Sequence, residues 1–332
     1  MKKMFMPLFA SISLHKSLCG KALLILVTVL SGILLSPSLM AQTGGVQGFE
    51  NNSVNGWTGG TAAENASVNS TLANVRTGSY SIGLNFTTTN SNRYCYSYTP
   101  YGSTASGTYV HLIYWAKASV ASTSVDASMR YANAAPPSGS GSTANGTAVA
   151  LSTSSWTRVA YTSGNSNGRH YFAAPRRTTG NITTVFMDDL VMYLGSNSTA
   201  DILSPNVPAS TSGTYSAGDA LLTWSSGGDN VATGTTGVQA TLVLKYTGTG
   251  TPVAPALNSQ AAYLVNDIPA TDWVVVKIDG TASGSNVNVG AISANTTYAL
   301  YHRDLAYNWS AASSLITVPF TACATPTLSG AS

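Results

Sequence analysis

Apolar and polar positions alternate with a period of two along much of this 332-residue chain. In residues 79–86 (SYSIGLNF), every second side chain from Tyr80 to Phe86 is apolar. Residues 108–118 (TYVHLIYWAKA) are apolar on both faces, which is typical of a central strand. Because successive side chains of a strand point to opposite faces, these patterns predict β-strands.

Turn signals interrupt the pattern every 8 to 12 residues or so, as expected of an all-β sandwich. Beyond the first 41 residues no stretch has a helical period. The length suggests two domains of roughly 100 to 150 residues each. The boundary falls in residues 195–210 (GSNSTADILSPNVPAS), where small polar residues and two prolines follow the first set of strands.

Residues 1–41 read as a secretory signal. Four lysines precede the apolar run of residues 22–35, and small residues follow, which predicts cleavage after Ala41. An uncleaved anchor is the alternative, but the run is shorter than the roughly 20 apolar residues of a membrane span. Without the four lysines, 11 basic residues face 12 acidic ones, so the exported chain is nearly neutral. No basic face is present for nucleic-acid binding.

Signatures of catalysis are absent from the sequence. The chain contains no H-E-x-x-H, C-x-x-C or phosphate-loop motif. Cys95 and Cys323, which remain after the signal, do not form a disulfide scaffold. We therefore expect no enzyme within these residues, although a catalytic domain could follow Ser332.

Two adjacent carboxylates, Asp188 and Asp189, lie in the apolar run of residues 186–193 (FMDDLVMY). On a strand they point to opposite faces, so they cannot flank one glycosidic bond. A buried carboxylate needs compensation. Two compensating partners remain open: a Ca²⁺ ion, or a cap of arginine or backbone N–H groups.

Tyrosines repeat at every second position in residues 93–101 (RYCYSYTPY). Tyr94, Tyr96 and Tyr98 therefore share one strand face and could stack against sugar rings. Ordinary packing within a sheet produces the same pattern. Asp126 and Arg130, on the polar side of residues 124–132 (SVDASMRYA), could add hydrogen bonds to a ligand, or could belong to a solvated face.

Basic side chains concentrate in residues 167–181 (NGRHYFAAPRRTTGN). Such a cluster could bind an acidic polysaccharide. We favour solvated loop residues, or partners for Glu50 and the Asp188–Asp189 pair.

Five segments of the first half resemble, in order, the carbohydrate-binding modules of the family 4/9 type and related galactose-binding-like jelly rolls. The resemblance covers residues 44–195, and its segments are GFENNSVNGW, NVRTGSYSIGLN, YVHLIYWAKA, WTRVAY and TTVFMDDLVMY. It implies a structural calcium held by Glu50 and Asp188, with a smaller part for Asp189.

Residues 201–318 resemble fibronectin type III-like modules of secreted Bacteroidetes-type proteins. Residues 220–226 (ALLTWSS) supply the core tryptophan, Trp224, and residues 297–313 (TYALYHRDLAYNWSAAS) supply the late strand and its turn. Tyr307 stands where glycine is usual. Such modules are generally spacers and transfer no catalytic residues.

The sequence thus predicts an all-β protein: a jelly-roll β-sandwich followed by an immunoglobulin/fibronectin-like β-sandwich. The expected parts are a signal (1–41), a carbohydrate-binding-like domain (42–197), a linker (198–208), a fibronectin-like domain (209–319) and the start of another module or linker (320–332). The expected function is glycan binding outside the cell, with structural Ca²⁺ as the one cofactor. The alternatives are a surface adhesin of stacked modules, or the accessory part of a larger secreted hydrolase or protease.

Overall fold

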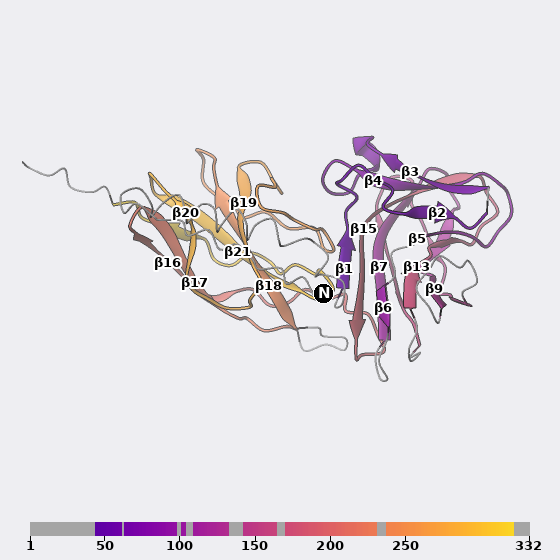
Figure 1. Cartoon of the computed structure of the whole chain (residues 1–332). Coiled ribbons are helices and arrows are strands. Elements are labelled where there is room, and N and C mark those ends of the chain that lie inside the picture. The colour runs from indigo at the N-terminus through magenta and orange to yellow at the C-terminus, as the bar shows by residue number, and fades with distance from the viewer. Residues whose placement is uncertain are drawn as a thin grey trace, which may run out of the picture. The chain divides into compact units, whose positions relative to one another are not determined.

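The computed structural model describes residues 44–61, 63–97, 101–103, 109–132, 142–164, 170–230 and 237–321. The predicted signal, Tyr98, Arg169 and Cys323 lie outside these residues. The described chain is all-β apart from one short 3-10 helix, η2 (Leu72–Asn74), so the predicted fold class is confirmed (Figure 1). None of its helical segments is long and apolar enough to cross a membrane.

One sheet contains the predicted central strand. Its order is β12-β7-β15-β4-β3, and β1 pairs with the far part of β15. The strands are β1 (Gly44–Gln47), β3 (Glu64–Asn69), β4 (Ser81–Phe86), β7 (Tyr109–Ala118), β12 (Thr157–Thr162) and β15 (Thr183–Gly195). The long apolar runs of β7 and β15 reflect burial on both faces: Leu112 and Met192 belong to the core, and Ile113 and Val191 on the opposite face are also buried.

Two further sheets of the first half pack against this one. The first has the order β11-β8-β14-β5-β2 and the second β10-β9-β13-β6. Their strands are β2 (Trp57–Gly59), β5 (Arg93–Ser97), β6 (Tyr101–Ser103), β8 (Ser124–Asp126), β9 (Met129–Ala132), β10 (Ser142–Ala144), β11 (Val149–Ala150), β13 (His170–Ala173) and β14 (Arg176–Arg177).

The core of this first sandwich lies between the two layers. It joins Leu84, Leu112 and Met187 of one layer to Val125 and Met129 of the other. The predicted buried face of residues 124–132 is therefore confirmed. The predicted single strand, however, is broken into β8 and β9 between residues 126 and 129.

The strands of the second half form two more sheets, with the orders β16-β17-β20 and β19-β18-β21-β22. These strands are β16 (Ala209–Ser216), β17 (Asp219–Ser225), β18 (Val238–Tyr246), β19 (Trp273–Asp279), β20 (Gly284–Ala291), β21 (Thr296–Asp304) and β22 (Ile316–Val318). Trp224 is buried between the sheets with Leu222, Val243 and Leu300, as its motif predicts. We call this the second sandwich.

A close backbone approach in the first sandwich requires glycine at position 59, where β2 pairs with β5. A Cβ atom there would lie 1.7 Å from the carbonyl oxygen of Glu64. We expect Gly59→Ala to lower the free energy of unfolding by about 1–3 kcal/mol, because the backbone must shift. Gly280→Ala is the matched control, since its Cβ would meet nothing within 4 Å. Urea unfolding measures both, and equal stabilities would contradict the prediction.

Candidate functional site

Aromatic rings and one arginine gather on the face of β5, β9 and β13 that points away from the core. Tyr94 and Tyr96 share this face as predicted, with ring centroids 6.1 Å apart. The ring centroids of Phe172 and Tyr96 are 5.9 Å apart. The Arg130 guanidinium lies 5.2 Å from both tyrosine rings and 5.9 Å from Phe172. We call these four side chains the aromatic–arginine face.

An ion pair between a buried aspartate and a partly exposed arginine borders this face. Arg176 stands directly between Tyr94 and Asp126 in the strand register of β5, β14 and β8. Its Nε and Nη2 atoms donate to Asp126 Oδ2 over 2.9 and 2.5 Å. The hydroxyl of Ser128 donates to the other oxygen of Asp126. The pair therefore fixes the Arg176 guanidinium on the strand next to that of Tyr94.

The solvated alternative for Asp126 and Arg130 is wrong, because their side chains are buried. Asp126 is committed to Arg176 and Ser128, so it positions Arg176 and does not face a ligand by itself. Tyr96 is only 8% exposed, which leaves half-buried Tyr94 as the ring with more surface to offer.

The predicted basic cluster has different partners from those expected. Arg176 pairs with Asp126, and neither Glu50 nor the Asp188–Asp189 pair is its partner. Arg177 is fully buried and donates to the carbonyl oxygens of Thr88, Asn90 and Asn181. The expectation of solvated loop residues is wrong for both arginines, since sequence alone does not show that β14 lies between two other strands.

Asp188 and Asp189 lie at a β-bulge, which changes the geometry predicted for them. Asp188 pairs with Trp115 of β7, but the next pair joins Val191 to Ile113, so β15 carries one extra residue. Asp189 takes up the irregularity with a φ of 49°, a left-handed conformation that aspartate tolerates better than most residues. The prediction that the two carboxylates point apart is therefore wrong.

Both carboxylates bind the same loop, residues 76–77. Asp188 Oδ2 accepts the backbone N–H groups of Arg76 (2.9 Å) and Thr77 (3.3 Å). Asp189 accepts the Thr77 hydroxyl over 2.6 Å and forms an ion pair with the Arg76 guanidinium. Burial and the charge of Asp189 raise the pKa of Asp188, while these N–H groups oppose the rise. Asp188 is thus capped by the backbone and Asp189 by arginine.

Glu50 lies beside the same loop without joining the pair. Its carboxylate accepts the N–H groups of Ser79 (2.8 Å) and Tyr80 (3.3 Å). Gly78 has a φ of 69°, and a Cβ there would lie 2.2 Å from the Glu50 carboxyl carbon, so glycine is required. Among the described residues, Glu50, Asp188 and Asp189 do not form a three-ligand group. The donors around Asp188 are N–H groups and compensate its charge without a cation; calcium here stays a prediction.

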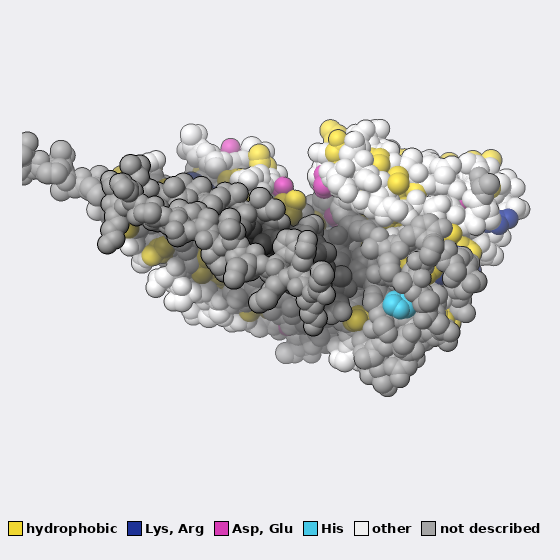
Figure 2. Space-filling view, in the orientation of Figure 1, with side chains coloured by type: hydrophobic (Ala, Val, Ile, Leu, Met, Phe, Trp, Pro, Cys, Tyr) yellow, Lys and Arg dark blue, Asp and Glu magenta, His cyan; other side chains and the backbone are white. Residues whose placement is uncertain are grey.

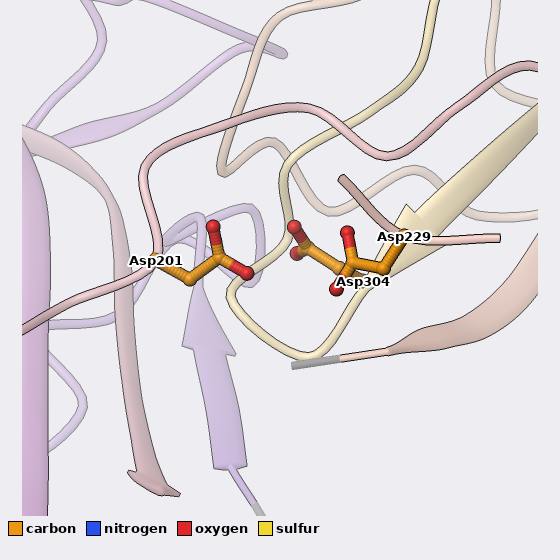
Figure 3. A group of neighbouring side chains, drawn as sticks. All are labelled: Asp201, Asp229 and Asp304. Atoms are coloured by element: carbon orange, nitrogen blue, oxygen red, sulfur yellow. The ribbon is translucent and has the colours of Figure 1, made fainter. Parts of the chain in front are cut away.

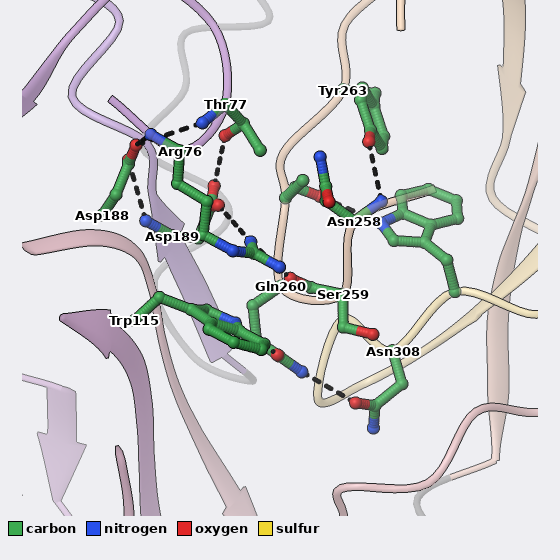
Figure 4. A network of polar contacts seen from close by, with 12 residues as sticks. Arg76, Thr77, Trp115, Asp188, Asp189, Asn258, Ser259, Gln260, Tyr263 and Asn308 are labelled. Atoms are coloured by element: carbon green, nitrogen blue, oxygen red, sulfur yellow. Dashed lines mark hydrogen bonds and ion pairs between the residues drawn. The ribbon is translucent and has the colours of Figure 1, made fainter. Parts of the chain in front are cut away.

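The loop that the aspartates hold also reaches the second sandwich (Figure 4). Arg76 Nη1 donates to the carbonyl oxygen of Ser259 over 2.9 Å, and its guanidinium lies 3.9 Å from the centroid of the Trp115 ring. Trp115 Nε1 donates to Gln260 Oε1 over 3.0 Å. Gln260 is fully buried, and its Nε2 donates to Ala306 O and to Asn308 Oδ1. A continuous polar network therefore joins the two sandwiches.

An apolar contact lies beside this network. Ile113, Val191 and Tyr193, on the outer face of the first sheet, are buried with Ala306 and Tyr307 of the second sandwich. Tyr307 stands where the resembling modules have glycine, and it has a φ of 60°. The Arg303 guanidinium carbon lies 4.0 Å from the centroid of the Tyr307 ring. The second sandwich is thus docked on the first, beyond the spacer role predicted for it.

A third group of carboxylates was not recognised in the sequence. Asp201, Asp229 and Asp304 place ligand oxygens within 4.8 Å of one another, which could hold a metal ion (Figure 3). Asn308 holds Asp304 through its N and Nδ2 atoms, each over 2.8 Å. The three come from the expected linker, the loop after β17 and the end of β21, so only the fold brings them together.

Comparisons with known proteins give distant structural likenesses. No family model and no curated protein matches the chain. The Endo-D glycoside hydrolase domain of Streptococcus pneumoniae R6 is 11% identical with a TM-score of 0.39, over 79% of this chain and 37% of that one. The CBM22-2 xylan-binding domain of Paenibacillus barcinonensis Xyn10C is 15% identical (TM-score 0.37), over 46% of this chain and 99% of that domain.

A third solved structure, TmCBM61 in complex with β-1,4-galactotriose, is 13% identical with a TM-score of 0.30. It aligns over 45% of this chain and 93% of its own length. All three likenesses have an identity of 15% or less and a TM-score below 0.4.

The bond from Trp115 to Gln260 can be tested by one substitution. Trp115→Phe keeps an aromatic ring but leaves the buried Gln260 oxygen without its donor, which costs about 1–3 kcal/mol. Trp156→Phe makes the same change at a half-buried tryptophan and should cost less. Equilibrium unfolding measures both variants. A Trp115→Phe loss no larger than that of Trp156→Phe would contradict this role.

The acidic group of the second sandwich predicts a pH dependence in the presence of chelator. Burial, chiefly, raises the pKa of Asp304 to about 8 from its ordinary value near 3.8. Its folded pKa is above its unfolded pKa, so its contribution to stability is lost as pH rises from about 4 to about 8. The slope is at most about 1.4 kcal/mol per pH unit.

The melting temperature of Asp304→Asn should therefore fall less between pH 5 and pH 8 than that of the parent chain. Thermal unfolding in EDTA measures both. Asp219→Asn, at an acid of β17 outside the group, is the control. An unchanged pH profile in Asp304→Asn would show that this carboxyl group does not titrate in the window.

Proposed function

We propose that the first sandwich is a non-catalytic glycan-binding module of an exported protein, and that the aromatic–arginine face is its binding surface. The observation that carries the proposal is the assembly of Tyr94, Tyr96, Phe172 and Arg130 on the sheet face opposite the core. Tyr96 and Phe172 form a small buried cluster with Ala174, and Tyr94 packs on it; this cluster is separate from the main core cluster of the first sandwich.

The chemistry of this face suits a sugar. The C–H faces of pyranose rings pack against aromatic rings, and their hydroxyl groups accept hydrogen bonds from guanidinium N–H groups. Arg176 is held in place by Asp126, and Arg130 by the rings around it, so little side-chain entropy is lost on binding. Tyr94 and Arg176, which are partly exposed, are the side chains that a sugar can contact directly. Tyr96, Phe172 and Arg130 are buried and support them.

The binding function can be tested with the chain from residue 42 onward. Affinity electrophoresis in gels that contain xylan, galactan, β-glucan, chitin derivatives or polygalacturonate measures retention by each glycan. Tyr94→Ala and Arg130→Met should each weaken retention about tenfold, equivalent to about 1.4 kcal/mol. Tyr215→Ala, which removes a half-buried tyrosine of the second sandwich, should leave retention unchanged.

Melting temperatures separate loss of binding from loss of folding. No retention of the parent chain by any glycan would contradict the proposal and favour a structural module of a surface protein. Retention that survives in both Tyr94→Ala and Arg130→Met would move the binding surface elsewhere.

A further inference from the structure

A cleft of about 580 Å³ lies where the two sandwiches meet, beside the Arg76 loop. Gly48, Glu50, Asp189 and residues 76–79 of the first sandwich line one side. The other side is lined by Asn258, residues 261–264 and residues 266–269 of the second sandwich. The volume lies within the range of small-molecule sites, roughly 300 to 1,000 Å³. The aromatic–arginine face contributes no residue to it.

The charge on the cleft walls is negative. Glu50 comes from the first sandwich and Asp267 from the second, and both line the cleft. Burial raises the pKa of Glu50, and the charges of Asp189 and Asp267 add to the rise. Asp189 also lines the cleft but is paired with Arg76, the one basic residue among the described lining residues. Glu50 and Asp267 form no ion pair among the described residues. Figure 2 shows acidic side chains on both sides of this hollow.

Both carboxylates are held in position and keep acceptor capacity. Each Glu50 oxygen accepts one backbone N–H, and Asp267 Oδ2 accepts the N–H of Leu264 over 2.6 Å. A carboxylate can accept about four hydrogen bonds, so each retains sites for a ligand. The positions of both groups are therefore set before any ligand arrives.

The remaining lining residues combine hydrogen-bonding groups with one aromatic ring. Tyr263 packs on Trp309 with centroids 5.6 Å apart, and its hydroxyl accepts the N–H of Asn258 over 3.0 Å. Side-chain amides and hydroxyls surround it, from Thr77, Ser79, Asn258 and Asn266. A fixed ring among short polar side chains is suited to one or two sugar units.

We propose that this cleft binds an amino sugar, whose protonated amino group lies between Glu50 and Asp267. The ammonium group would form charge-assisted hydrogen bonds with both carboxylates and relieve their repulsion. The same charge disfavours uronic acids and sulfated sugars. This site is separate from the aromatic–arginine face, and both sandwiches are needed to form it.

Isothermal titration calorimetry near neutral pH, with EDTA present, tests the proposal on the chain from residue 42 onward. The probes are tetramers of glucosamine, N-acetylglucosamine and galacturonate. We expect the glucosamine tetramer to bind at least about tenfold more tightly than the other two. Glu50→Gln and Asp267→Asn should each weaken this binding about tenfold, whereas the remote Asp219→Asn should not.

Tyr94→Ala separates this proposal from the proposed function. Glucosamine binding that survives Tyr94→Ala but falls in both cleft variants supports the cleft. This holds whether or not affinity electrophoresis shows retention at the aromatic–arginine face. Equal binding of the glucosamine and N-acetylglucosamine tetramers, or binding unaffected by Glu50→Gln and Asp267→Asn, would overturn it. Binding lost in Tyr94→Ala would assign the sugar to the aromatic–arginine face and would also overturn it.

Discussion

The ion pair between Asp189 and Arg76 is the interaction on which the junction of the two sandwiches depends. The bulge in β15 turns both adjacent aspartates toward residues 76–77, where one caps the backbone and the other holds the guanidinium. An uncompensated buried carboxylate costs several kcal/mol, so the loop cannot leave without exposing or protonating the pair. The fixed guanidinium then lies over Trp115 and donates to the second sandwich.

The same anchor positions the cleft. Residues 76–79 form one wall of it, and their conformation is set by Asp188, Asp189 and Glu50 together. The aromatic–arginine face depends instead on the register of β5, β14 and β8, in another sheet of the first sandwich. The protein thus offers two surfaces of different chemistry, one aromatic and cationic, the other acidic.

Period-two patterns were sufficient to predict the strands, the central position of β7 and the shared face of Tyr94 and Tyr96. They failed at Asp189, because one inserted residue reverses the alternation and no local signal marks it. They could not pair Arg176 with Asp126, or bring Asp201, Asp229 and Asp304 together, since these contacts join residues distant in sequence. The docking role of Gln260 was missed for the same reason. A buried polar residue in a loop carries no period that would reveal its partner.

A double-mutant cycle between Asp189 and Gln260 tests the central claim most directly. The two side chains share no hydrogen bond, and Arg76, Trp115 and Ser259 connect them. Unfolding free energies of Asp189→Ala, Gln260→Ala and the double variant give the coupling. We predict a coupling free energy of about 1 kcal/mol, because removing either residue loosens the same junction. Additivity within roughly 0.3 kcal/mol would show that the aspartate pair does not support the docking of the second sandwich, and would contradict this account.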